Sequence, residues 1–132
     1  MSHVFTYGSL MFPEVWTRVV AGTYRAVPGR VDGHQRFEVR DETYPGMVAR
    51  ADCGVEGVLY LDVDDADLAR LDAFEGEDYL RATVQVVSDD GTRDAQTYIY
   101  RLHDRLHDRL WEPKAFAMER FLATYCKERL GS

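Results

Sequence analysis

Two segments that lie far apart in the chain carry residues that could do chemistry, and the first is the turn Gly8–Leu10. It directly follows Val4–Tyr7, a β-branched and aromatic run that is typical of a strand. Backbone N–H groups in such a turn can form a concavity that binds an anion, and a carboxylate is its natural guest. Ser9 is a weak candidate for a nucleophile because the G-x-S-x-G pattern around it is incomplete. The turn therefore predicts carboxylate binding.

The second segment is Leu71–Arg81, in which Glu75 stands between Phe74 and Gly76. Glu75 comes at the end of an apolar helical face, away from the acids that begin that helix. A carboxyl group in partly apolar surroundings tends to have a raised pKa and can accept and return a proton. The alternative is an ordinary surface acid at a helix terminus, and the spacing alone leaves both interpretations open.

Histidine and cysteine spacing predicts no metal site and no cofactor. His103 and His107 would share a helix face, but a catalytic zinc needs three protein ligands and the usual glutamate beside the first histidine is missing. Cys53 and Cys126 match neither a redox pair nor a zinc spacing, and we expect two buried free thiols. The glycine-rich patterns that bind nucleotides are also absent from the sequence.

Two short helices are expected to position the chemical residues. Pro13 near the first turn and Gly22 beyond the last predict a helix directly after the Gly8–Leu10 turn. Asp64 or Asp65 can cap a second helix, which ends at Gly76 and therefore delivers Glu75 at its C-terminal end. The apolar face of the second helix has helical spacing and consists of Leu68, Leu71 and Phe74.

Turn residues recur at intervals of about 10 residues between Thr23 and Val63, which favours an antiparallel barrel or sandwich. We expect Val55–Val63 to be a central strand, and Asp89-Asp90-Gly91 to join two later strands as a hairpin. The turn signals before Val55 are Pro28-Gly29, Asp32-Gly33, Tyr44-Pro45-Gly46 and Cys53-Gly54.

The C-terminal part of the chain is predicted to be helical. Arg101–Asp108 contains an Arg-Leu-His-Asp repeat, from which we expect one or two helical turns. Pro113 then begins the clearest long helix, which ends before Gly131 and is expected to pack as a lid on the sheet or against a partner. The apolar face of this helix consists of Met118, Phe121, Leu122, Tyr125 and Cys126.

The composition is that of one globular domain spanning residues 1–132. Hydrophobic residues make up 45% and charged residues 30%, and no linker-like stretch divides the chain. A net charge of -7 has the wrong sign for phosphate backbones or anionic lipid, so we expect no nucleic-acid or membrane partner. The chain has no apolar run of membrane-spanning length and no secretory signal, which predicts a cytoplasmic protein.

Taken together, Val4–Met11 and Leu71–Arg81 resemble the signatures of the γ-glutamylcyclotransferase-like family, and most closely its avirulence-induced-gene branch. Tyr44-Pro45, Val55–Tyr60 and Tyr98–Tyr100 extend this resemblance in the same order along the chain. The resemblance implies an α+β fold, a small mixed β-barrel of about six strands with flanking helices. Thr6, Tyr100 and the Arg-Leu-His-Asp repeat depart from the family pattern.

The resemblance also implies roles for individual residues. Glu75 matches the catalytic glutamate of the family, Tyr79 is expected to line the pocket, and Arg81 is expected to pair with a nearby acid. The turn that would hold the α-carboxylate of a γ-glutamyl group consists of Tyr7, Gly8, Ser9 and Leu10.

The implied reaction is an intramolecular cyclisation. The α-amine of a γ-glutamyl peptide or amine attacks its own γ-carbonyl, releasing 5-oxoproline and an amine, while Glu75 acts as general base and then acid. This mechanism requires that Glu75 and the Gly8 turn meet across a cavity sized for a glutamyl group. The alternatives are a non-catalytic small-molecule binding module and an interaction domain that uses the C-terminal helix. The leaving amine stays open, and both a monomer and a homodimer fit the sequence.

Overall fold

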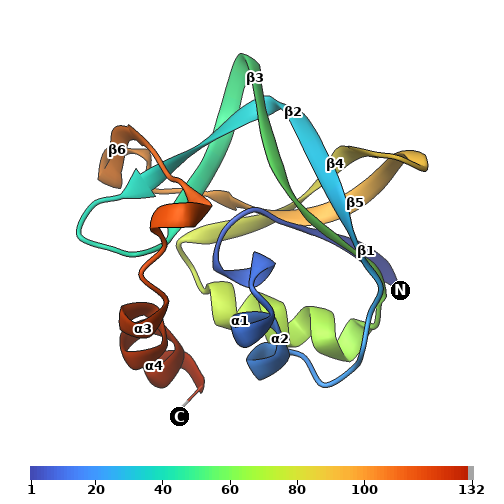
Figure 1. Cartoon of the computed structure of the whole chain (residues 1–132), viewed down its shortest axis with the longest axis horizontal. Coiled ribbons are helices and arrows are strands. Elements are labelled where there is room, and N and C mark those ends of the chain that lie inside the picture. The colour runs from blue at the N-terminus through green and yellow to red at the C-terminus, as the bar shows by residue number, and fades with distance from the viewer. Residues whose placement is uncertain (131–132) are drawn as a thin grey trace.

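The computed structural model describes residues 1–130 and contains a closed barrel of five strands (Figure 1). The strands follow one another in the order β3-β1-β5-β4-β2, and pairing between β2 and β3 closes the barrel. β1 runs parallel to β5 while the other neighbours are antiparallel, and β6 adds a sixth strand beside β2. The predicted α+β fold with a small mixed barrel is confirmed. The strands are β1 (Ser2–Thr6), β2 (Ala26–Val39), β3 (Pro45–Val63), β4 (Tyr79–Ser88), β5 (Gly91–Tyr100) and β6 (Leu106–Leu110).

The predicted helices before residue 76 are confirmed. α1 spans Pro13–Val19 with Pro13 at its start, and α2 spans Asp65–Glu75 with the Asp64 side chain accepting a hydrogen bond from the Asp67 N–H. Figure 1 shows α1 and α2 together on one side of the barrel, with the C-terminal helices next to them. No helix within residues 1–130 is long and apolar enough to cross a membrane.

Three of the four predicted turns between Thr23 and Val63 are wrong, because the residues concerned lie inside two long strands. Pro28-Gly29 and Asp32-Gly33 belong to β2, and Cys53-Gly54 belongs to β3. The register of β2 on β3 shifts between Asp32, which pairs with Gly54, and His34, which pairs with Ala49, so the ladder is irregular at this point. Such residues bend and twist a strand without ending it, and a bent strand can wrap around a small barrel.

The segment from Arg101 to Asp108 also differs from the prediction. It forms a single 3₁₀ turn, His103–Arg105, and then enters β6, so His103 and His107 do not share a helix face. The backbone N–H of Arg40 bonds to the Arg105 carbonyl over 2.8 Å, and β6 continues along β2. Pairing with an unfilled strand edge has therefore overridden the local helical pattern.

The predicted C-terminal helix begins at Met118, after a 3₁₀ turn at Pro113–Ala115. It consists of α3 (Met118–Phe121), a π-helical turn (Leu122–Cys126) and α4 (Lys127–Leu130). Gly131, the predicted end signal, lies outside the described residues. Cys126 is fully buried, whereas Cys53 on β3 is only half-buried, so the expectation of two buried thiols is wrong for Cys53.

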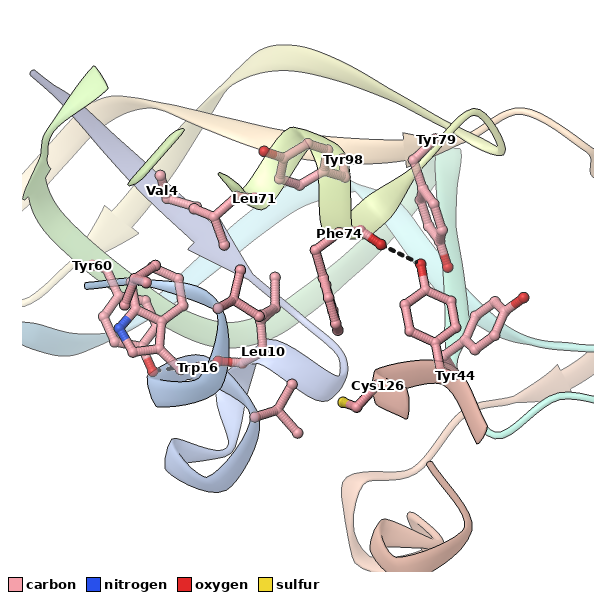
Figure 2. Packing of buried hydrophobic residues seen from close by; sticks show 14 of the residues in the cluster. Val4, Leu10, Trp16, Tyr44, Tyr60, Leu71, Phe74, Tyr79, Tyr98 and Cys126 are labelled. Carbon is pink, nitrogen blue, oxygen red and sulfur yellow. Dashed lines mark hydrogen bonds between the residues drawn. The ribbon is translucent and has the colours of Figure 1, made fainter. Parts of the chain in front are cut away.

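The core has two parts because successive strand residues point to opposite faces of the sheet. Phe5 points into the barrel with Met47 and Leu59, whereas the preceding Val4 packs with residues of the helices. The second cluster lies between the barrel and the helices and is rich in aromatic rings (Figure 2). In it Trp16 of α1 stacks on Tyr60 of β3 with ring centroids 3.6 Å apart.

Asp67 joins the start of α2 to the connection that follows α1. This buried carboxylate accepts hydrogen bonds from the N–H groups of Ala21 and Gly22, from the Tyr24 hydroxyl and from Arg70. Burial alone would raise the pKa of Asp67, but these hydrogen bonds hold it well below its usual value. The ionised carboxylate therefore stabilises the fold wherever the pH is above the ordinary pKa of an aspartate.

Replacing Asp67 by asparagine is expected to lower the free energy of unfolding at pH 7 by about 3 kcal/mol, because it leaves buried donors without a charged acceptor. Urea unfolding of the variant and of the wild type measures this loss. The exposed neighbour Asp65, changed to asparagine, is the matched control and should cost less than about 0.5 kcal/mol. The loss should shrink below about pH 4, where the unfolded aspartate takes up its proton; a loss independent of pH would contradict this account.

Candidate active site

One cavity between β1, the end of α2 and the C-terminal helices is bordered by every predicted site residue. Tyr7, Gly8, Ser9 and Leu10 form one side, and Glu75 and Tyr79 form the other. The structure thus brings together two segments that lie far apart in the sequence, with β2 and β3 between them. Their functional roles stay a prediction. The other lining residues are Phe5, Thr6, Tyr44, Pro45, Phe74, Tyr98, Phe121 and Tyr125.

The glycine turn is shaped by a close approach to the start of β3. A Cβ atom at Gly8 would lie 2.8 Å from Cγ of Pro45, so only glycine allows the turn to lie against this proline. The chain then forms a 3₁₀ turn at Ser9–Met11, closed by a 3.0 Å hydrogen bond from the Met11 N–H to the Gly8 carbonyl. The first N–H groups of such a turn have no acceptor within it. The residues that carry them, Gly8, Ser9 and Leu10, border the cavity.

Arg36 and Tyr98 fix the residue that precedes the turn. The Tyr7 hydroxyl donates a 2.6 Å hydrogen bond to the Tyr98 carbonyl, and Arg36 Nη1 donates a 2.7 Å hydrogen bond to the Tyr7 carbonyl. Arg36 also bonds to the Glu56 carbonyl and stacks over Trp111, so its guanidinium is held from three sides. The peptide that enters the turn is therefore anchored to β2, β3 and β5.

Glu75 is the last residue of α2, and Gly76 ends the helix immediately behind it. Gly76 has a φ of 78°, in the left-handed region that favours glycine, and its N–H bonds to the Asp72 carbonyl over 3.1 Å. The negative end of the helix dipole disfavours the ionised form of an acid at this position. The sequence thus places a carboxyl group where its charge is poorly tolerated.

The cavity environment makes Glu75 a weak acid. Glu75 is partly accessible from the cavity, yet the protein surrounds it so closely that burial raises its pKa to about 8. The positive charge of Arg129 opposes this rise and the negative charge of Asp72 adds to it. A carboxyl group with this pKa is mostly protonated at pH 7 and can exchange a proton with an amine.

Tyrosines from several elements line the same cavity as Glu75, and Figure 2 shows Tyr79 and Tyr98 among them. Tyr79 donates a 2.7 Å hydrogen bond to the Pro45 carbonyl, which ties β4 to the strand that the Gly8 turn contacts. Tyr98 donates to Asp72 Oδ1 over 2.7 Å, and Arg81 pairs with the same oxygen at 3.3 Å, which confirms that Arg81 pairs with an acid. Burial raises the pKa of the Tyr79 hydroxyl well above its ordinary value, so Tyr79 stays protonated.

Sequence reasoning missed the aromatic wall contributed by Tyr44, Phe121 and Tyr125. The rings of Phe121 and Tyr125 stack at 5.1 Å, and Tyr44 meets Tyr125 edge to face at 5.0 Å. The apolar face of the C-terminal helix was the sequence signal for Phe121 and Tyr125, but the spacing of apolar residues does not show what that face covers. With this wall in place the cavity has a volume of about 30 Å³, which holds about two water molecules. The expectation of a cavity already sized for a glutamyl group is therefore wrong for this conformation.

Potential metal ligands do not gather around this cavity. Within residues 1–130, no group of three or more histidine, cysteine, aspartate or glutamate side chains is placed to hold a metal ion. The chemistry that the site offers is proton exchange by Glu75 and hydrogen bonding by backbone N–H groups and tyrosines.

Comparison with protein families and curated proteins gives consistent matches. A family model described as gamma-glutamyl cyclotransferase, AIG2-like, matches residues 4–116. The Arabidopsis thaliana protein AIG2 C is 34% identical over 100 residues, which are 74% of this chain and 61% of that protein. A Methanocaldococcus jannaschii protein named as a gamma-glutamylcyclotransferase and putative RNase is 32% identical over 100 residues, which are 74% of this chain and 45% of that protein. The chain spans less than two thirds of the length of these relatives.

Solved structures share the fold. A solution structure of an Arabidopsis thaliana protein has a TM-score of 0.73 at 30% identity, covering 96% of this chain and 81% of that chain. A structure named gamma-glutamyl cyclotransferase has a TM-score of 0.69 at 17% identity, covering 99% of this chain and 86% of that chain. At such low identity the second likeness concerns the fold alone.

The raised pKa of Glu75 predicts how stability depends on pH. Between about pH 5 and the folded pKa of about 8, the folded protein keeps a proton that the unfolded chain has lost. Stability of the wild type therefore falls with rising pH, by at most about 1.4 kcal/mol per unit from this group. Glu75→Gln has no such proton, so urea unfolding should show the variant gaining stability relative to the wild type up to about pH 8. The exposed Glu77→Gln is the control, and a constant difference for Glu75→Gln would mean an ordinary pKa.

Proposed function

The chain belongs to the gamma-glutamyl cyclotransferase, AIG2-like family, and on this basis we propose that it is a cyclotransferase-type enzyme that releases 5-oxoproline from γ-glutamyl compounds. The observation that carries the proposal is the shared cavity of the Gly8 turn and Glu75. An anion-binding turn and a proton-exchanging acid are the two groups that this reaction needs from the protein.

In the proposed complex the turn binds the α-carboxylate of the substrate. Backbone N–H groups of Gly8, Ser9 and Leu10 act as donors, and Tyr7 supports them because its carbonyl is fixed by Arg36 and its hydroxyl by Tyr98. The same anchoring places the α-amine on the Glu75 side of the cavity. Holding the substrate folded brings the amine close to the γ-carbonyl, and such orientation can supply several kcal/mol of rate enhancement.

Glu75 then moves the proton. Its carboxylate takes a proton from the α-ammonium, the amine nitrogen attacks the γ-carbon, and the amide C–N bond breaks as Glu75 returns the proton to the leaving amine. The α-amine of a γ-glutamyl compound lies beside a free carboxylate, which keeps its pKa above the roughly 7.7–8.0 of a peptide α-amine. A pKa of about 8 for Glu75 therefore makes the first transfer much less costly than it would be for an ordinary glutamate. Tyr79 borders the cavity and holds its wall by donating its hydroxyl proton to the Pro45 carbonyl, so backbone N–H groups are left to stabilise the negative charge that develops on the carbonyl oxygen.

A non-catalytic binding module on the same fold is the second candidate, and the raised pKa of Glu75 favours it because the neutral acid does not repel an anionic ligand. An ionised glutamate would repel an anionic ligand, but Glu75 with a pKa of about 8 is mostly neutral at pH 7. The cavity can therefore bind a carboxylate whether or not it performs catalysis. Incubation with γ-glutamyl dipeptides, glutathione and γ-glutamyl-lysine, followed by measurement of 5-oxoproline, separates the two. A ligand-dependent rise in Tm without product would support the binding module.

Replacing Glu75 by glutamine should abolish most of the activity while the protein stays folded. General acid–base catalysis contributes about 10²- to 10⁴-fold, and kcat for 5-oxoproline release is expected to fall by this amount. Glu77→Gln, two residues further along and exposed, should keep the wild-type kcat. If Glu75→Gln released 5-oxoproline at a near-normal rate, Glu75 would not be the proton carrier.

The pH profile of kcat/KM should be a bell whose acid limb lies near pH 8. The reactive state holds one proton between Glu75, with a pKa of about 8, and the substrate amine, whose pKa is higher because a free carboxylate lies beside it. Below about pH 8 both groups are protonated, and above the pKa of the amine neither is, so the rate falls on both sides. The acid limb measures Glu75 in the free enzyme. A profile that is already flat at about pH 6 would contradict the raised pKa.

A further inference from the structure

The narrow cavity must enlarge before it can accept a γ-glutamyl compound. A glutamyl group is several times larger than the one or two water molecules that fit in about 30 Å³. Part of the wall is fixed, because the strands β1, β3, β4 and β5 that contribute to it belong to the closed barrel. Phe121 and Tyr125 contribute another part of the wall, and they lie on the C-terminal helical segment, outside the barrel.

This segment, residues 118–130, is attached differently from the rest of the site. It begins beyond residue 116, where the family match ends, and it adds Phe121 and Tyr125 to a cavity whose other lining residues all lie within the match. Within the segment only Phe121, Tyr125 and Cys126 are buried. A π-helical turn at Leu122–Cys126 includes two of these three residues, and π turns inside helices are often found at functional sites.

Two side chains of the segment donate hydrogen bonds to the matched part of the fold, in addition to the packing of the Phe121 and Tyr125 rings against Tyr44 and Phe74. The Tyr125 hydroxyl bonds to the Phe74 carbonyl over 2.7 Å, a hydrogen bond drawn in Figure 2, and reaches the Glu75 carbonyl at 3.1 Å. Arg120 bonds to the Asp41 carbonyl over 3.0 Å. All three acceptors are backbone carbonyls of the matched part of the fold. The contacts can therefore break without disturbing the barrel.

A second hollow lies on the other side of Tyr44 and Tyr125, which border both spaces. It has a volume of about 400 Å³ and is lined by charged side chains of both signs. We call this hollow the vestibule. Its cations are Arg105, Arg120 and Arg129, and its nearest acids include Asp41, Asp78 and Glu128.

We propose that residues 118–130 form a gate, and that displacement of Phe121 and Tyr125 joins the Glu75 cavity to the vestibule as one substrate site. The glutamyl half then occupies the space between Glu75 and the Gly8 turn, and the amine half lies in the vestibule. The identity of this ligand rests on the proposed function, whereas the gate itself does not. A vestibule lined by charges suits a polar, hydrated amine half better than an apolar one.

Cys126 reports whether the gate opens. Its thiol is fully buried on the inner face of the segment, and Figure 2 shows Cys126 among the residues of the core cluster between the barrel and the helices. In a Cys53→Ser background it is the single thiol of the chain, so its reaction with a chromogenic aromatic disulfide measures exposure. Opening of the gate alone should give a labelling rate that does not change at low urea concentrations, because little surface is exposed. A rate that rises with urea as steeply as global unfolding would overturn the proposal.

Weakening either contact should speed the labelling without unfolding the protein. Tyr125→Phe removes the hydroxyl donor and is expected to raise the Cys126 labelling rate about five-fold, as is typical for one net hydrogen bond. Arg120→Met, at an exposed position, should act in the same direction. Thr124→Ala is the matched control, because the Thr124 hydroxyl bonds only within the segment to the Arg120 carbonyl. Equal rates in all three variants and the parent would overturn the gate.

A ligand should hold the gate open. In a Glu75→Gln, Cys53→Ser protein, saturating γ-glutamyl-alanine is expected to accelerate Cys126 labelling, because the ligand occupies the space that Phe121 and Tyr125 fill. Binding that raises Tm but slows or leaves unchanged the labelling would show that the segment is not displaced. If the wild type releases no 5-oxoproline from any γ-glutamyl compound, the proposed function fails while the ligand-free labelling still decides the gate.

Discussion

The site depends on a carboxyl group that is buried at the end of a helix and kept from ionising. Glu75 has three causes for a raised pKa, which are burial in an aromatic cavity, the nearby charge of Asp72 and the negative end of the α2 dipole. This cost in stability is set against a large core that is rich in aromatic rings. A residue whose pKa is shifted this far by burial is more often found at a functional site than at a structural one.

The barrel is what keeps Glu75 and the Gly8 turn at a fixed separation. β1 is paired on both sides, with β3 and β5, so the turn that follows it cannot shift along the sheet. Tyr79 at the start of β4 bonds to the Pro45 carbonyl, and Pro45 in turn lies against Gly8. Glu75 precedes β4 by a few residues, so the same contacts position it. Local packing around one proline therefore aligns residues from both ends of the site.

The sequence was sufficient for features that local residue types decide, and insufficient for those that depend on pairing at a distance. Asp64, Gly76 and Pro13 marked the helix ends correctly because capping is local. The turn signals at Pro28-Gly29 and Cys53-Gly54 failed because closure of a small barrel uses such residues to bend long strands. Arg101–Asp108 failed because the open edge of β2 recruited it as β6. The site residues could be named from two motifs, whereas Tyr44 and Tyr125 became visible only through tertiary packing.

The gate and the proton state of Glu75 are physically coupled. Burial is the largest cause of the raised pKa, and Tyr125, which bonds to the Phe74 and Glu75 carbonyls, is part of what buries the carboxyl group. In the proposed open form water reaches the cavity and lowers the pKa of Glu75 toward its ordinary value, and a substrate that then fills the cavity excludes this water and restores the raised pKa. The closed form therefore favours the neutral acid and the open form favours the carboxylate. A substrate ammonium that enters the open site meets the ionised glutamate, which is the form that can accept its proton.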